Sequence, residues 1–211
     1  MTYEEFYGSA LPQMKQTEQE LLDKISAYTE TFEESGVKPV VYFCSRLKSP
    51  ESVLRKCRVQ EIEPSVESAF ENLFDLIGIR VVCAFASDVY RMAEWLRKQP
   101  DIKIIREKDY YAYPKPNGYR SYHIQLNHLT SGMPAEIQIR TIATDFWATL
   151  EHQLKYKKKI PAERMIRDEL KRCADEIASV DISMQTIREI IQESLGCSEE
   201  IPIHSRIQVN G

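Results

Sequence analysis

The strongest constraint on the fold is an apolar run near the middle of the chain, residues 77–85, which reads Ile-Gly-Ile-Arg-Val-Val-Cys-Ala-Phe. A run with so little polar alternation is typical of a strand that other elements cover on both faces. Its one charged residue is Arg80, and a buried cation must be paired or must point into a polar pocket. The run therefore predicts an inner strand of a covered sheet, with Arg80 directed at a polar partner.

The rest of the chain alternates between helical and β-type patterns. Helical spacing or start signals cover residues 14–32, a segment opening at 49–51, and then 66–74, 87–98 and 141–155. The dipeptide Ser87-Asp88 is expected to cap the fourth of these helices. Further β-type stretches cover 40–44, 102–105, 119–126 and 135–141, with turns at 114–118 and 131–134. These elements predict an α+β fold, in which a mixed five-stranded sheet is flanked by helices.

A length of 211 residues suits one core-bearing domain with appended helices. We expect an N-terminal helical region at 1–36, a core at 37–160, a C-terminal helical region at 161–195 and a flexible tail at 196–211. Apolar residues of the long C-terminal helix follow a heptad spacing, at positions 166, 170, 173, 177, 180, 184, 187 and 191. This seam requires a partner surface, and its own domain or a second copy of the chain would serve equally well.

Composition argues against several classes of protein. The net charge of −4 gives no reason to expect nucleic-acid binding. The five cysteines are widely spread and form no C-x-x-C pair, so we expect free thiols in a reducing cytoplasm and no structural zinc. No apolar run approaches the roughly 18 residues that span a bilayer, and the first residues lack the basic region of a signal peptide. The expected protein is soluble and cytoplasmic, with no membrane contact.

Local charge is more informative than net charge. One basic cluster surrounds the single acid Glu51 and consists of Arg46, Lys48, Arg55, Lys56 and Arg58. A second cluster at residues 155–159 contains four lysines. Two separate cationic clusters indicate contacts with polyphosphates.

Two carboxylates stand where a binding site could use them. Asp75 lies just before the apolar strand, where it is either a magnesium ligand or a capping or surface residue, and on this residue alone the second interpretation is favoured. In the strand at 135–141, alternation places Glu136, Gln138 and Arg140 on one face. That face is either the wet side of an antiparallel strand or a surface that offers a carboxylate, an amide and a guanidinium to a ligand.

The segment 114–123 combines a Pro-Asn-Gly turn with aromatic and cationic side chains, namely Lys115, Tyr119, Arg120, Tyr122 and His123. Such a loop can present an aromatic face for a base, worth about 1–3 kcal/mol, with cations that hold the attached phosphates. A plain hairpin with cross-strand tyrosines fits the same pattern equally well. In the helix that follows, we expect Glu151 and His152 to be a structural hydrogen-bonded pair.

Five segments in a fixed order resemble the synthetase domain of the RelA/SpoT alarmone enzymes. They are R-L-K from Arg46, F-D-L-I-G-I-R-V to Val82, N-G-Y-R-S-Y-H to His123, E-I-Q-I-R-T to Thr141 and D-F-W-A-T-L-E-H to His152. The likeness extends from about residue 11 to about residue 190 and is nearest to the stand-alone small alarmone synthetases. It implies a nucleotidyltransferase-like synthetase fold with long N- and C-terminal helices. Because the chain has no His-Asp dipeptide, no hydrolase domain is expected.

The resemblance implies that the β,γ-pyrophosphate of ATP is transferred to the 3′-hydroxyl of GDP or GTP, with Mg²⁺ as cofactor, giving (p)ppGpp and AMP. It leaves the preference among GDP, GTP and GMP open. The implied metal-binding and catalytic residues are Asp75 and Glu136, the second as a metal contact or as the base. The implied ATP contacts are Arg46, Lys48, Lys56, Arg58 and Arg80. The implied contacts with the guanine nucleotide are Lys115, Tyr119, His123, Gln138 and Asp145.

The resemblance also implies a homo-oligomer, since small relatives are commonly tetramers. Two rival interpretations remain open. A nucleotidyltransferase would need a Gly-Ser turn followed by paired aspartates, which this sequence lacks. An RNA-binding or regulatory module would use the tyrosines to stack bases and the lysines to hold phosphates, and Glu136 would then be dispensable.

Overall fold

The computed structural model describes residues 1–32, 38–155 and 163–194 of the chain. The predicted tail at 196–211, Cys197 and the lysines at 157–159 lie outside the described residues. The helices are α1 (Tyr3–Tyr7), α2 (Ala10–Glu30), α3 (Pro50–Val59), α4 (Val66–Asn72), α5 (Ala86–Arg97), α6 (Ile142–Lys155) and α7 (Glu163–Ser194). The strands are β1 (Val40–Leu47), β2 (Ile77–Cys83), β3 (Ile102–Asp109), β4 (Tyr122–His128) and β5 (Pro134–Thr141).

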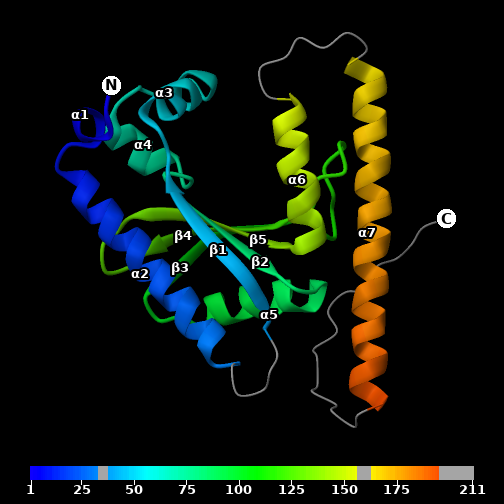
Figure 1. The fold of residues 1–211 in the computed structure, drawn as a ribbon. Helices are drawn as coiled ribbons and strands as arrows, with labels where there is room; N and C mark the ends of the chain where they lie inside the picture. Colours follow the sequence, from blue (N-terminus) through cyan, green and yellow to red (C-terminus); the bar gives the residue numbers. More distant parts are fainter. Residues whose placement is uncertain (33–37, 156–162, 195–211) are drawn as a thin grey trace.

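The strands form one mixed sheet in the order β1-β2-β5-β4-β3 (Figure 1). The inner strands β2 and β5 are parallel, and every other neighbouring pair is antiparallel. Helices flank this sheet, and the chain includes a long helix near each end, α2 and α7. The predicted α+β fold with a mixed five-stranded sheet is therefore confirmed.

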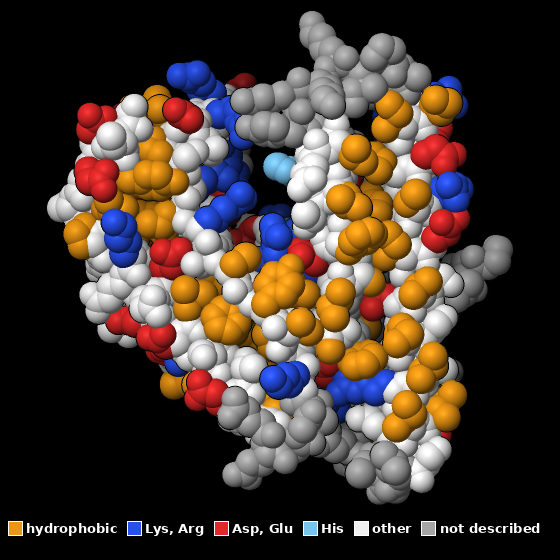
Figure 2. Space-filling view, viewed as in Figure 1, with side chains coloured by type: hydrophobic (Ala, Val, Ile, Leu, Met, Phe, Trp, Pro, Cys, Tyr) orange, Lys and Arg blue, Asp and Glu red, His pale blue; other side chains and the backbone are white. Residues whose placement is uncertain are grey.

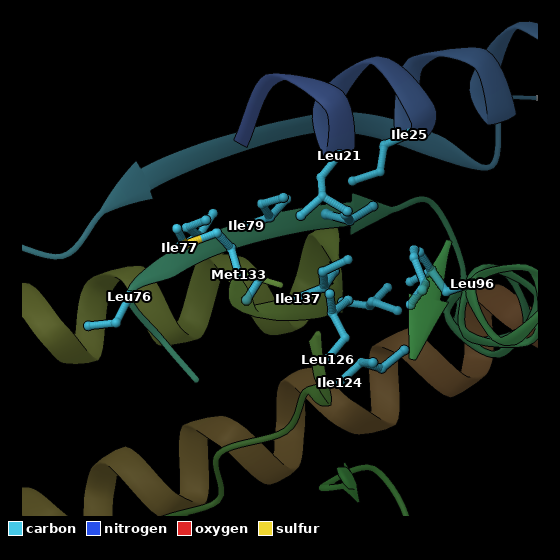
Figure 3. Packing of buried hydrophobic residues seen from close by; sticks show 14 of the residues in the cluster. Leu21, Ile25, Leu76, Ile77, Ile79, Leu96, Ile124, Leu126, Met133 and Ile137 are labelled. Atoms are coloured by element: carbon cyan, nitrogen blue, oxygen red, sulfur yellow. The ribbon is translucent and has the colours of Figure 1, made fainter. Parts of the chain in front are cut away.

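The two faces of the sheet have opposite chemistry. On β2 the residues Ile77, Ile79 and Val81 are almost fully buried, whereas Gly78 and Arg80 between them are only partly buried. Helices α2 and α5 cover the apolar face, to which they contribute Leu21, Ile25 and Leu96 (Figure 3). The core thus occupies one face of the sheet and leaves the other face for polar side chains.

Several element ends differ from the sequence prediction. Helix α5 begins at Ala86, and Phe85 is its N-cap, so the predicted Ser87-Asp88 cap is wrong. The side chain of Asp88 is buried and binds Arg188 of α7 instead. Strand β4 begins at Tyr122 rather than at residue 119, because the backbone of residues 119–121 bonds to the preceding turn and to Tyr110. Helix α1 was not predicted, and Thr2 caps it through a capping box.

Helix α7 shows how the predicted heptad seam is used. It packs beside α6, where Trp147 Nε1 donates to the backbone carbonyl of Leu170 at 2.9 Å (Figure 1). The seam is partly covered as far as Ile177, but Val180 and Met184 farther along are 60% and 48% exposed. The helix therefore packs on its own domain along its first half and leaves the seam open along its second. Within the described residues, no helix combines the length and apolar character needed to cross a membrane.

The second half of α7 is attached to the core by polar contacts. Arg188 Nη1 donates to Asp88 Oδ2 at 2.7 Å, and its guanidinium lies 4.6 Å from the centre of the Phe85 ring. Burial raises the pKa of Asp88, while the hydrogen bond and charge of Arg188 act to lower it. Removal of Arg188 would leave the Asp88 carboxylate in a site that disfavours its charge, with the more distant Arg91 Nη1, 3.9 Å from Oδ1, as its remaining ion-pair partner.

We predict that Arg188→Ala destabilises the protein by about 3 kcal/mol at pH 7, as expected when one partner of a buried ion pair is lost. The deficit should shrink as the pH is lowered, because a protonated Asp88 needs no cation. Denaturant unfolding at pH 7 and at a lower pH measures the loss of unfolding free energy under each condition. The matched control is Arg172→Ala, which removes an exposed arginine of the same helix and should change stability by less than about 0.5 kcal/mol. Equal losses for the two variants would contradict the prediction.

Candidate active site

The polar face of the sheet carries two rows of side chains that cross all five strands. Strand pairing aligns Arg46, Gly78, Glu136, Gln125 and Arg106 in one row. The same pairing aligns Cys44, Arg80, Gln138, His123 and Lys108 in the next. Because paired residues of neighbouring strands lie on the same face, these rows bring charged and amide groups from distant parts of the sequence together.

A cleft of about 90 Å³ opens over these rows. Its lining consists of Cys44, Ser45, Arg46, Asp75, Gly78, Ile79, Arg80, Glu136 and Gln138. Figure 2 shows Lys and Arg side chains gathered along a hollow between the α3 side of the molecule and α6. The two predicted carboxylates thus share one cationic recess with Arg46 and Arg80.

Asp75 lies at the entrance to β2 between two lysines. Lys48 Nζ donates to Asp75 Oδ2 at 2.7 Å, and Lys56 Nζ lies 2.8 Å from Oδ1. The backbone of Lys48 also donates to the carbonyl of Leu76 at 2.8 Å, which joins the end of β1 to the start of β2. Burial acts to raise the pKa of Asp75, but the hydrogen bonds and charges of the two lysines outweigh it and hold the pKa below its usual value. The carboxylate is therefore ionised and surrounded by cations.

Glu136 is held in a different way. Gln138 Nε2 donates to Glu136 Oε1 at 2.9 Å, and Gln125 Nε2 donates to Oε2 at 3.1 Å. His123 Nδ1 lies 3.7 Å from Oε1. Burial lowers the pKa of His123, the charges of nearby cations lower it further, and the charge of Glu136 only partly opposes them. The contacts around Glu136 are thus neutral donors, which orient the carboxylate without cancelling its charge.

Asp145, in the first turn of α6, connects three strands. Its Oδ1 atom lies 2.9 Å from Arg140 Nη1 and 3.3 Å from Arg80 Nη1, and Oδ2 accepts a hydrogen bond from the Tyr42 hydroxyl. Burial and this hydrogen bond raise the pKa of Tyr42 to about 12. Asp145 therefore compensates the two arginines of the inner strands and fixes their direction.

Tyr119 stands at the far end of the same network. Its hydroxyl accepts from Arg140 Nη2 at 2.9 Å and lies 2.9 Å from His123 Nε2. The ammonium of Lys115 lies 4.9 Å from the centre of the Tyr119 ring and 4.8 Å from that of Tyr110. A cation thus sits against two aromatic faces, a position where a flat ligand could be bound.

The structure brings most of the predicted site residues together. Arg58 is the exception, since it is exposed on the last turn of α3 and, in the described part of the chain, neither lines the cleft nor forms a hydrogen bond or ion pair with another predicted site residue. Sequence reasoning missed Gln125, Tyr42 and Tyr110. The alternation of polar residues along β4 could have identified Gln125 beside His123. Nothing local indicated Tyr42, because its partner Asp145 lies 103 positions away.

The donor set fits a magnesium ion. Mg²⁺ prefers hard oxygen ligands and usually takes one or two carboxylates together with substrate phosphates. Asp75 and Glu136 line the same cleft, and Asp75 already accepts two ammonium groups there. Among the described residues, no three His, Cys, Asp or Glu side chains converge to hold a metal ion on their own. The protein would therefore supply two carboxylates, and a bound phosphate would complete the coordination.

A cationic cleft with two carboxylates on the open face of a mixed sheet is typical of proteins that bind phosphorylated ligands. The family model described as "Region found in RelA / SpoT proteins" matches residues 45–161. The chain therefore belongs to the RelA/SpoT family.

Individual relatives agree with this assignment. GTP pyrophosphokinase YwaC of Bacillus subtilis is 38% identical over 160 residues, which span 73% of this chain and 76% of that protein. Small alarmone synthetase 1 of Bacillus subtilis, in a crystal structure bound to its product pppGpp, superposes with a TM-score of 0.77 at 31% identity. That match covers 85% of this chain and 94% of the other. A GTP pyrophosphokinase family protein of Streptococcus pneumoniae superposes with a TM-score of 0.79 at 33% identity, over 92% and 97% of the two chains.

The environment of His123 leads to a prediction about protonation. We expect its imidazole to be neutral at pH 7 in the folded protein and to titrate below the ordinary value of 6.5. In the unfolded chain the imidazole is protonated below that value, so stability is lost as the pH falls through it. NMR titration of the imidazole measures the pKa directly. The variant His123→Gln should lose less stability between pH 7 and pH 5 than the wild type, and a midpoint at or above 6.5 would contradict this account.

Proposed function

We propose that this protein is a GTP pyrophosphokinase, which transfers the β,γ-pyrophosphate of ATP to the 3′-hydroxyl of GDP or GTP and so produces (p)ppGpp and AMP. The observation that carries the proposal is the polar face of the sheet, where Asp75 and Glu136 share one cleft with Arg46 and Arg80. Phosphoryl-type transfer requires a protein mainly to position two polyanions and to stabilise the charge that spreads between them. This cleft has the cations and the carboxylates for both tasks.

The ATP side of the proposed site is the half built by β1, α3 and β2. Arg46 and Arg80 flank the adenine ring, and Lys48 and Lys56 contact the phosphates. Both lysines already contact Asp75, which lines the cleft. A bound triphosphate can therefore form an ion pair with an ammonium group that now contacts the carboxylate. Arg58 is assigned to the same phosphates from the resemblance, and its exposed position at the end of α3 allows an approach from solvent.

The acceptor side is the half built by the turn at 114–118 and by β4 and β5. Tyr119 stacks on guanine, and Lys115 leaves its place over the Tyr119 ring to contact the acceptor's phosphates, which His123 also approaches. Gln138 supports the site through its contact with Glu136. For Asp145 a contact with the guanine edge stays a prediction, since its carboxylate here binds three protein groups.

Glu136 is the residue that we assign to the 3′-hydroxyl. Neutral amides hold both of its oxygens, so its negative charge is available to accept a proton or to share a metal ion with Asp75. A bound Mg²⁺ would neutralise developing charge on the transferred phosphates. The side chains of Gln125 and Gln138 meanwhile keep the carboxylate directed at the acceptor.

We also propose that the chain forms a homo-oligomer, a tetramer by analogy with small relatives. Apolar side chains on α6 and α7 are exposed, as the orange groups of Figure 2 show, and on α6 they are Ile142, Phe146, Leu150 and Leu154. Exposed apolar side chains spaced by four residues on a helix are typical of a surface that a partner covers. Light scattering tests this, and a monomer at micromolar concentration would refute it. The domain division at 37–160 and 161–195, and the cytoplasmic location, stay predictions.

The function is tested by product identification. The protein is incubated with ATP, magnesium and GDP, GTP or GMP in turn, and the products are identified by mass. We expect AMP together with a guanine nucleotide that has gained two phosphates. Release of pyrophosphate with addition of a nucleotide would instead indicate a nucleotidyltransferase. If the protein binds guanine nucleotides or RNA but forms no product, the result would instead indicate a binding module.

The role of Glu136 is tested by Glu136→Gln, which keeps the shape and removes the charge. We expect turnover to fall by about 10²–10⁴-fold, the usual contribution of a general base, while the affinity for the acceptor stays nearly the same. Steady-state kinetics and calorimetric titration with the guanine nucleotide measure the two quantities. Glu67→Gln, on the exposed face of α4, is the matched control and should not change either. Retained turnover in Glu136→Gln would remove this residue from the chemistry.

A further inference from the structure

The support of Tyr119 differs from that of the other site residues. The strand-borne residues rest on the main core, whereas the Tyr119 ring packs against a separate small cluster of Trp147, Ala148 and Ala174. Two of these residues belong to α6 and one to α7. Helix α7 thus helps to form the surface on which the Tyr119 ring packs, and it also accepts a hydrogen bond at 2.7 Å from Thr141 at the end of β5, through Asp181.

The backbone next to Tyr119 touches α7 closely. Gly118 has a φ of +86°, and a Cβ added there would lie 2.5 Å from the Cβ of Ala174 and 3.5 Å from the carbonyl oxygen of Lys171. Real Cβ atoms do not approach a neighbour so closely, so only glycine fits this contact. Such a close contact fixes the distance between the turn and helix α7.

Polar contacts hold the turn on both sides of this glycine. Arg120 Nη1 donates to the Gly118 carbonyl at 3.1 Å, and Nη2 donates to Asp175 of α7 at 3.4 Å. On the other side Asn117 Nδ2 donates to Glu151 of α6 at 3.2 Å, and its Oδ1 accepts from the Tyr119 backbone at 3.3 Å. Both helices thus contribute to one support beneath the turn.

We propose that Ala174 and Asp175 of α7 are positioning residues for the guanine-nucleotide side of the site, acting through Gly118 and Arg120 on the Tyr119 ring. This inference rests on the proposed role of Tyr119 in acceptor binding. It assigns control over acceptor recognition to α7, whose described side chains do not line the cleft. The ATP side is built by β1, α3 and β2, and its link to this support is indirect, through Asp145 of α6, which lies 3.3 Å from Arg80 Nη1.

The test is a double-mutant cycle between the turn and the helix. Gly118→Ala should raise the acceptor KM by about 10- to 100-fold, the effect of displacing a substrate-positioning group by about 1 Å. The ATP KM should change by less than about twofold. Ala174→Gly in the same chain removes the atom that the new Cβ would strike, so the double variant should recover most of the acceptor affinity. The kcat should change less than the acceptor KM.

Gly132→Ala is the matched control for backbone strain. Gly132 has a φ of +71°, but a Cβ there would meet nothing within 4 Å, so this variant measures the left-handed penalty alone. It should leave the acceptor KM unchanged. If Gly118→Ala acted only through its backbone angle, Ala174→Gly could not rescue it, and the proposal would be wrong. An acceptor KM that does not change in Gly118→Ala, or an ATP KM that rises equally, would also refute it.

A second variant covers the case in which Gly118→Ala fails to fold. Asp175→Ala removes the ion pair with Arg120. Because the Asp175 side chain is about half exposed, the expected increase in the acceptor KM is smaller, about two- to fivefold. Glu176→Ala removes an exposed partner of Arg172 on the same helix and should have no effect. An acceptor KM unchanged in Asp175→Ala would count against the proposal.

Hydrogen exchange separates this inference from the proposed function. In Asp175→Ala and Gly118→Ala, the backbone amides of residues 117–121 should exchange faster than in the wild type, whether or not the protein makes alarmone. If the wild type yields no pyrophosphorylated product but exchange rises in this way, the proposed function fails and the support of the turn stands. If product is made and neither exchange nor the acceptor KM responds, the support fails and the function stands.

Discussion

The carboxylate of Asp145 is the contact on which the polar face of the sheet depends. The inner strands β2 and β5 each direct an arginine to this face, Arg80 and Arg140, and two guanidinium groups so close together repel each other. A cation removed from water without a partner costs several kcal/mol. One carboxylate at the start of α6 contacts both arginines, which allows them to remain side by side on covered strands. Without it, the face that holds the cleft could not carry this density of positive charge.

The two carboxylates of the cleft are held differently, and the difference fits the two tasks that we propose for them. Asp75 is bound by two ammonium groups, which give the half that we propose for ATP a positive potential, and its carboxylate could exchange those cations for a metal ion and phosphates. Glu136 is bound by two amides and lies beside a neutral His123, so its charge is not compensated. This arrangement suits the proton acceptor that we propose Glu136 to be, because in general a cation in contact with a carboxylate makes it a weaker base.

Local patterns predicted the elements of this fold, the family resemblance supplied most of the candidate site residues, and long-range contacts explain what both missed. The apolar run at 77–85 and the alternation at 135–141 each depend on neighbours in sequence, so the sequence alone identified β2, β5 and the face of Glu136. The cap assigned to Asp88 was wrong because its partner Arg188 lies 100 positions away and outweighs the local preference. The heptad spacing correctly predicted a helix with one apolar face in α7, but it did not predict which half of that face the domain would cover. Periodicity identifies the apolar face of a helix and not the surface that packs against it.

The inward and outward sides of helix α7 carry different kinds of residue. Small residues such as Ala174 face the domain and let the turn at Gly118 approach closely, while Val180 and Met184 face outward along the open part of the seam. A packed helix transmits displacement along its length because its side chains are close-packed against their neighbours. The outward residues belong to the same helix as Ala174, and Asp181 and Arg188 attach this half of the helix to β5 and α5. A partner that covers the seam would contact the helix that supports the turn carrying Tyr119, the residue that we propose to stack on guanine.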